Sequence, residues 1–231
     1  MDRPDTAKSS PFTTHWPTPS PRLRSSRQFS SIRKENASMP DPLLPKPAVQ
    51  PSSVTVNGLT LALAQTRETV SIGPFAKCLP DLNAALASAF GATLPADFST
   101  TSGHDGLQLT RAAHHQWFAH AQAGAGLMAR LVPLCAGLAA LTNQTDSRVT
   151  LCLRGTGADA VAAKLVPVDL APDHFGPGST ALTLAGHIPV ILSRPDVTPG
   201  LDFTVFRSFA RSLHHDIHVA MKGGIPNSER V

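Results

Sequence analysis

Apolar and polar side chains alternate over several short stretches of this chain, which is the pattern of a β-strand with one buried face. The connection at residues 186–189 joins two of these stretches, so we expect them to pair with each other. The predicted strands are residues 69–73, 107–111, 149–153, 180–184, 190–192 and 203–206.

Other stretches repeat their apolar residues at helical spacing. Pro80 suits the first turn of a helix, and Gly91 suits its end. The expected apolar face of this helix consists of Leu82, Leu86, Ala89 and Phe90. We expect a second helix in residues 117–141, bent or ended near Pro133 because proline cannot continue the helical hydrogen bonds.

Residues 158–165 are expected to form a third helix, and a fourth closes the chain with arginines and histidines on its polar face. The apolar residues of the fourth helix are Phe206, Phe209, Leu213, Ile217 and Met221. The strand-helix-strand order therefore occurs twice along the chain. It predicts an α+β fold made of two packed strand-helix-strand units.

The first part of the chain has a different composition. Residues 1–51 hold ten of the 21 prolines, and residues 1–38 carry seven Lys/Arg against three Asp/Glu, whereas the rest is neutral with 13 of each. Such a segment buries too little apolar surface to fold. We predict a disordered basic, Pro-rich tail and linker at 1–51, a folded domain at 52–222 and a flexible C-terminus at 223–231. The basic charge belongs to the tail and is no sign of nucleic-acid binding.

Two origins of the tail stay open. Residues 22–24 and 27–29 would suit a transit peptide, but five prolines between Pro4 and Pro21 would break its amphipathic helix. We favour Met39 as the true start of the protein, with the residues before it added by a misplaced start codon.

The cysteines and the hydropathy predict a cytoplasmic protein that does not enter the membrane. Cys78, Cys135 and Cys152 are an odd number with wide spacing, so neither a disulfide framework nor a zinc ribbon is indicated. The most apolar stretch, residues 124–141, contains Arg130 and is too short to span a bilayer.

Three patterns suggest chemistry, and for each we favour a structural interpretation. Gly155 and Gly157 match a relaxed dinucleotide fingerprint, but no acidic residue follows at the expected distance, so we expect Thr156 to cap a helix with Asp159 in its first turn. The histidines at 114, 115, 120, 214 and 218 could bind a metal, but we expect solvated faces. A Ser-His-Asp hydrolase built on 169–179 lacks a nucleophile elbow.

Several arginines are better interpreted as contacts to another protein chain, because guanidinium groups pair with carboxylates and stack on aromatic rings at interfaces. We expect Ser208 to cap the last helix. The candidate subunit-interface residues are Arg148, Arg154, Phe175, His187, Arg194, Arg207, Ser208, Phe209 and Arg211.

A family resemblance rests on a series of short segments whose order and spacing are more specific than any one of them. The segments are residues 91–95, 117–118, 145–155, 168–170, 175–179, 187–190 and 207–213. Through them, residues from about Leu59 to Met221 resemble the gamma subunit of heterotetrameric sarcosine oxidase. The resemblance implies a fold like that of the glycine-cleavage aminomethyltransferases and their folate-binding relatives.

The resemblance also implies a place in a four-chain enzyme that demethylates sarcosine to glycine, with hydrogen peroxide and either formaldehyde or methylene-tetrahydrofolate as further products. FAD, FMN, NAD and tetrahydrofolate would then belong to the alpha, beta and delta chains, and this chain would be structural, with no catalytic, cofactor or metal site. The alternative is a stand-alone folate-binding module. The Lys-Gly-Cys-aromatic-x-Gly-Gln-Glu signature of one folate-using group is missing, and residues 174–178 read His-Phe-Gly-Pro-Gly at that place.

Overall fold

The computed structural model describes residues 46–196 and 199–223, which form the compact body of the chain. The disordered tail, the start at Met39 and the flexible C-terminus lie outside the described residues, apart from 46–51 and 223, and stay predictions. Val49, which we assigned to the linker, is only 4% exposed and packs in the core. No helix in the two described ranges is long and apolar enough to cross a membrane.

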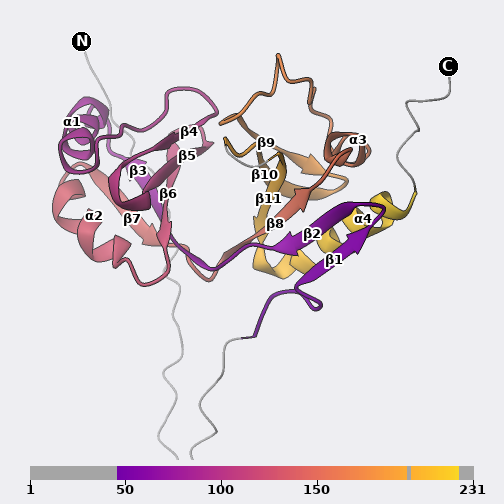
Figure 1. Cartoon of the computed structure of the whole chain (residues 1–231). Coiled ribbons are helices and arrows are strands. Elements are labelled where there is room, and N and C mark those ends of the chain that lie inside the picture. The colour runs from indigo at the N-terminus through magenta and orange to yellow at the C-terminus, as the bar shows by residue number, and fades with distance from the viewer. Residues whose placement is uncertain (1–45, 197–198, 224–231) are drawn as a thin grey trace, which may run out of the picture. The chain divides into compact units, whose positions relative to one another are not determined.

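The body contains two antiparallel sheets, each with helices on one face, and this confirms the predicted α+β class (Figure 1). Sheet A has six strands in the order β1-β2-β8-β11-β10-β9. Their bounds are β1 Ser53–Val56, β2 Leu59–Leu63, β8 Arg148–Arg154, β9 Thr180–Ala185, β10 Ile188–Ser193 and β11 Gly200–Phe206. Its helices are α3 Ala158–Ala162 and α4 Ala210–Lys222, with the 3-10 turn Arg207–Phe209 before α4.

Sheet B has five strands in the order β4-β5-β6-β3-β7. Their bounds are β3 Arg67–Pro74, β4 Thr100–Ser102, β5 Gln108–Ala113, β6 Gln116–Gln122 and β7 Ala139–Asn143. The helices of this half are α1 Leu79–Phe90 and α2 Leu127–Cys135, and a short 3-10 turn spans His104–Gly106.

Each sheet buries the face that carries its helices. On sheet A, alternate residues of β8 and β11 pack with one side of α4, because successive strand side chains point to opposite faces. These fully buried residues are Leu151, Leu153, Leu201, Phe203, Val205, Leu213, Ile217 and Met221. Sheet B is built in the same way around Val70, Ile72, Leu109, Leu82, Leu86 and Leu131.

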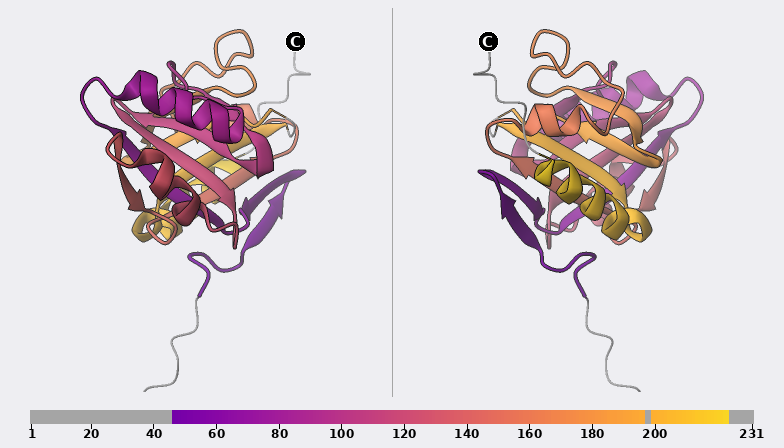
Figure 2. Two further views of the ribbon diagram at one scale, coloured as in Figure 1. Left: turned by 90° about the vertical axis from the view of Figure 1, so that its left-hand side faces the viewer. Right: turned by 90° about the vertical axis from the view of Figure 1, so that its right-hand side faces the viewer.

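The helix-free faces of the two sheets are turned toward each other, so the helices form the outer layers (Figure 2). A small cluster of Ala112, Phe118 and Ile191 joins the two faces. At one edge the sheets are also linked through the backbone, where the Thr180 amide donates to the Phe98 carbonyl at 2.9 Å. Between these contacts the facing surfaces carry mostly polar side chains, and this is where the candidate site lies.

The predicted second helix is wrong in its first part. Trp117 and Phe118 lie in β6, and the helix there is α2, which begins only at Leu127 and contains Pro133. Trp117 packs under the helices while Phe118 faces the other sheet. Because β6 is buried on both faces, its sequence lacks the alternation that identifies a half-buried strand.

The predicted apolar face of the last helix is also partly wrong. Phe206 ends β11 and Phe209 lies in the 3-10 turn, and they are 40% and 44% exposed. Ser208 does not cap α4, since no side chain forms a cap hydrogen bond there. His214 points inward and is 9% exposed, so the predicted solvated face does not hold for it.

The first helix agrees with the prediction in its start and its end. Pro80 lies in its first turn, and Gly91 ends it with φ 70° and an amide hydrogen bond to the Ala87 carbonyl. Ala89, however, is exposed rather than buried. Strands β1, β2, β4 and β7 were not predicted, because strands of three to five residues carry little periodic signal.

The first turn of helix α2 is capped by a side chain from strand β3. The Glu68 carboxylate on β3 accepts hydrogen bonds from the amides of Gly124, Gly126 and Leu127 at 3.0, 3.2 and 2.5 Å. The pKa of Glu68 lies below its ordinary 4.5, chiefly because of the Leu127 amide. A carboxylate here satisfies amides that a helix leaves without partners and favours the positive end of the helix dipole.

We therefore predict that Glu68→Gln lowers the unfolding free energy at pH 7 by about 1 kcal/mol. Since the folded-state pKa is lowered, the wild-type contribution is present above pH 4.5 and is lost as the pH falls through the lowered value. Urea unfolding at several pH values measures both effects. The matched control is Asp81→Asn in the first turn of α1, where no side-chain cap hydrogen bond forms. An equal loss in both variants would contradict the prediction.

Candidate functional site

Arg148, at the start of β8, is a half-buried arginine that lies against two aromatic rings, as Arg111 on β5 also does. The Arg148 guanidinium carbon lies 3.9 Å from the ring centroid of Phe206 and 4.9 Å from that of Phe118, so the cation is held against two aromatic faces. Burial lowers the pKa of this guanidinium. Among the described residues no carboxylate forms a salt bridge with it, and its buried Nε has no hydrogen-bond partner.

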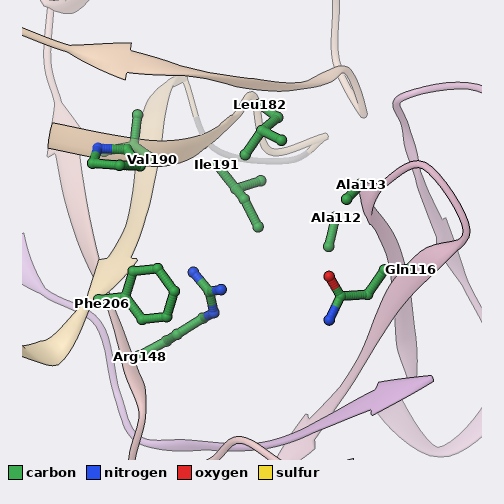
Figure 3. A pocket seen from close by; sticks show the side chains of 9 residues that line it. Ala112, Ala113, Gln116, Arg148, Leu182, Val190, Ile191 and Phe206 are labelled. Carbon is green, nitrogen blue, oxygen red and sulfur yellow. The ribbon is translucent and has the colours of Figure 1, made fainter. Parts of the chain in front are cut away.

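The guanidinium borders a pocket of about 150 Å³ between the two sheets (Figure 3). Arg148 and the amide of Gln116 point into this pocket from opposite sides. Gln116 is held in place because its Nε2 donates to Ser71 Oγ at 2.9 Å. The other lining residues are apolar, namely Ala112, Ala113, Leu182, Pro189, Val190, Ile191 and Phe206.

Further basic groups lie behind Phe118 on the same face of sheet B. The His120 ring is 6.0 Å from the Phe118 ring, and its Nδ1 forms a 3.1 Å hydrogen bond with Thr69 Oγ1. The pKa of His120 is lowered to about 4, chiefly by burial and then by the nearby charges of Arg67 and Arg148. His120 is therefore neutral at pH 7, and the predicted solvated face is wrong for this residue too. The charges beside it are positive.

Large apolar side chains surround the open side of the pocket. Leu182 is 54% exposed and Phe206 is 40% exposed, although both line it. Leu184 lies two residues along β9 on the same face as Leu182, and it is 48% exposed. We name Leu182, Leu184, Pro189 and Phe206 the apolar rim. This rim is uncovered in the described chain.

Three of the predicted interface residues hold the chain together internally. Arg194 pairs with Asp159 at 3.1 Å and donates to the carbonyl oxygens of Phe175 and Leu170 at 2.6 and 3.0 Å. Phe175 itself is 4% exposed. Arg154 pairs with Asp202 on the neighbouring strand and also donates to the Leu201 carbonyl at 2.9 Å. Their contact with a partner chain stays a prediction.

The other predicted interface residues are exposed. Arg207, Ser208 and Phe209 directly follow Phe206, so they lie next to the apolar rim, and Arg207 donates to the Lys46 carbonyl. Arg211 lies in the first turn of α4, and His187 in the turn between β9 and β10. Arg148 is the predicted residue that borders the pocket.

The sequence gives no direct sign of the residues that surround Arg148. Phe206 had been assigned to a helix core, and Phe118 to a helix. Leu182 and Leu184 did alternate with threonine in a predicted strand, which is a real signal. Alternation shows that two side chains share a face of a strand, but it does not show whether another layer covers that face.

Gly155 has a packing role that explains it without a nucleotide. Its φ is 113°, and an added Cβ would lie 2.6 Å from the Gly58 carbonyl oxygen, so the β1–β2 turn passes too close for any other residue. The predicted cap at Thr156 is wrong, because the helix N-cap is Gly157 in a left-handed conformation. Asp159 does lie in the first turn of α3, where it pairs with Arg194.

The polar groups that suggested catalysis are dispersed. Asp169 and His174 form an exposed pair, and within the described chain Ser179 makes no side-chain hydrogen bond to either. The pKa of the Asp169 carboxyl is lowered chiefly by the Ala171 amide and then by His174. The pKa of the Cys152 thiol is raised to about 12 by burial and by Asp202, so it is no nucleophile. No three His, Cys, Asp or Glu side chains in the described ranges converge as a metal site requires.

Two solved structures are similar to this fold. A chain of the heterotetrameric sarcosine oxidase from Corynebacterium sp. U-96, solved in complex with pyrrole 2-carboxylate, matches with a TM-score of 0.65 and 22% identity over 74% of this chain and 88% of that chain. The glycine cleavage system aminomethyltransferase T from Bartonella henselae matches with a TM-score of 0.55 and 18% identity over 71% of this chain. This chain spans 46% of that aminomethyltransferase, about half its length.

These likenesses confirm the predicted fold, which is shared by a chain of sarcosine oxidase and part of an aminomethyltransferase. No protein-family model and no curated protein sequence matches this chain.

The surroundings of His120 give a testable pH dependence of stability. Its pKa is about 4 in the folded chain and near 6.5 when unfolded, so the unfolded state binds the proton first as the pH falls. We predict that the free energy of unfolding decreases by roughly 1–3 kcal/mol as the pH falls from 6.5 to 4. The lower end of this range applies because the His120 side chain is only half-buried. Chemical unfolding of the full chain at a series of pH values measures this decrease.

His120→Asn should remove most of this decrease, with His214 contributing the remainder because burial and then His218 and His215 lower its pKa as well. The control is His187→Asn, at an exposed turn. Equal pH dependence in wild type and His120→Asn would show that this histidine is not the cause.

Proposed function

We propose that this chain is a gamma-type structural subunit of a sarcosine-oxidising complex. The supporting observation is that its described body matches nearly the whole of one chain of a heterotetrameric sarcosine oxidase.

The local geometry supports an assembly role over a catalytic one. The polar groups of the pocket are an arginine and an amide, with a neutral histidine nearby, and neither Arg148 nor Gln116 can act as a nucleophile or general base at neutral pH. In this proposal the alpha, beta and delta chains supply FAD, FMN, NAD and tetrahydrofolate. The complex would convert sarcosine to glycine, hydrogen peroxide and a one-carbon unit in the cytoplasm.

A second candidate is a folate-binding module, favoured by the likeness to an aminomethyltransferase. The pocket between the sheets argues against it, since its volume is about 150 Å³ whereas sites for ligands of this size usually enclose about 300–1,000 Å³. A more open depression of about 420 Å³ at Glu68 and Asp146 carries carboxylates, which would repel the glutamate tail of a folate.

We predict that the alpha, beta and delta chains assemble and oxidise sarcosine less well when this chain is omitted from co-expression. The yield of the four-chain complex on gel filtration, and the hydrogen peroxide formed per mole of flavin, measure assembly and turnover separately. Omitting a structural subunit should lower the yield of the complex strongly. It should change the turnover per mole of flavin little in the complex that does form. Equal assembly and turnover without this chain would contradict the proposal.

Titration calorimetry of the full chain with tetrahydrofolate distinguishes the two candidates. The structural proposal predicts no saturable heat at micromolar to millimolar ligand. A saturable heat that Gln116→Ala or Arg148→Met removes would instead support the folate-binding module.

A further inference from the structure

We infer that the apolar rim and the pocket beneath it dock a segment of a partner subunit that inserts an acidic side chain toward Arg148. This inference rests on the proposed function, because it assigns the docking surface of the proposed subunit. It commits to one occupant, a Glu or Asp side chain flanked by apolar residues.

Charge complementarity is the first argument. In the described chain, Arg154 and Arg194 both have carboxylate partners, whereas Arg148 has aromatic rings and no carboxylate. A half-buried guanidinium without an acceptor has lost part of its hydration and gained no ion pair in return. A carboxylate entering the pocket would supply the acceptor and could accept two parallel N–H bonds.

The size and walls of the pocket give the second argument. Its volume of about 150 Å³ is enough for the end of a Glu or Asp side chain. The Gln116 amide enters opposite Arg148 and can bind the same carboxylate from the other side (Figure 3). The remaining wall is apolar, with Ile191 among its residues, and a charge-assisted hydrogen bond is stronger in such surroundings than in water.

The rim favours a protein over a small free anion. Leu182, Leu184 and Phe206 are between 40% and 54% exposed and lie around the mouth of the pocket or beside it. A free anion the size of acetate would leave these side chains in water, whereas a partner segment would cover them. A buried arginine surrounded by apolar residues that exclude water is the usual composition of an interface hot spot.

The chain's own N-terminal segment is a poor occupant. Residues 1–45 carry seven Lys/Arg and four Asp/Glu, Asp41 near Leu43 among them, so the segment as a whole has the same sign of charge as the site. Arg67, beside His120, adds to this positive charge. A partner chain with an acidic, apolar segment matches the site better.

The test uses the full chain with the alpha, beta and delta chains and compares three variants. Arg148→Met keeps the length of the side chain and removes its charge, Leu182→Lys changes the exposed rim, and Val132→Lys changes an equally exposed residue on α2 as a control. We expect Arg148→Met and Leu182→Lys each to weaken assembly about tenfold or more, and Val132→Lys to stay within about twofold of wild type. Arg148→Lys should recover part of the loss, and the melting temperature of each isolated chain checks folding.

A photo-reactive benzoylphenylalanine in place of Leu182 then identifies the occupant. We expect a cross-linked partner peptide that contains Glu or Asp next to apolar residues. A cross-link to residues 1–45 or 224–231 of the same chain, or to a peptide without an acidic residue, would overturn the inference.

The possible failures are distinguishable. If the wild-type chain forms no complex with the other three chains, the proposed function and this inference both fail. If the complex forms and Arg148→Met and Leu182→Lys assemble as well as Val132→Lys, the inference alone fails. If sodium acetate raises the melting temperature of the wild-type chain but not of Arg148→Met, and assembly is unaffected by both variants, the pocket binds a free carboxylate instead.

Discussion

Each of the two sheets buries one face under helices, so its second face needs another packing partner. This constraint governs the rest of the structure. Here the helix-free faces are turned toward each other. They touch through a small apolar cluster of Ala112, Phe118 and Ile191, and through the Arg148 guanidinium on the Phe118 ring. One part of the space between them forms the pocket at Arg148, whose lining is apolar apart from Arg148 and Gln116.

The arginines show how the fold distributes charge. Arg154 and Arg194 each pair with a carboxylate and donate to backbone carbonyl oxygens. These groups replace the water that the guanidinium loses on burial, and they connect neighbouring segments around sheet A. Among the described residues, Arg148 contacts the faces of two rings, which contribute roughly 0.5–2 kcal/mol. A residue that gains so little within its own chain is a candidate for contact with another molecule.

The likeness to an aminomethyltransferase and to a chain of sarcosine oxidase defines a fold, and one fold can serve different functions. The residues on the surface of this chain give separate evidence about its role. A small pocket with a cation, an amide and an exposed apolar rim is suited to receive a side chain of another protein. In the described part of the chain the Cys152 thiol has a raised pKa because it is buried, Asp202 pairs with Arg154, and Asp169 pairs with His174.

The strands with one clean face, such as β8 and the β9–β10 pair, were predictable because alternation is a local property of the sequence. The end of α1 at Gly91 was predictable for the same reason, since its left-handed conformation depends on one residue. Strand β6 was not, because it is buried on both faces and therefore resembles a helix in composition.

For the site, the sequence by itself made Arg148 a candidate contact residue and determined that Leu182 and Leu184 share a face. Only the tertiary structure decided that Phe118 and Phe206 close around Arg148, and that no described carboxylate reaches it. The physical reason is distance along the chain. Phe118 and Phe206 lie 30 and 58 positions from Arg148, and such residues meet only through the pairing of strands and the packing of one sheet on the other.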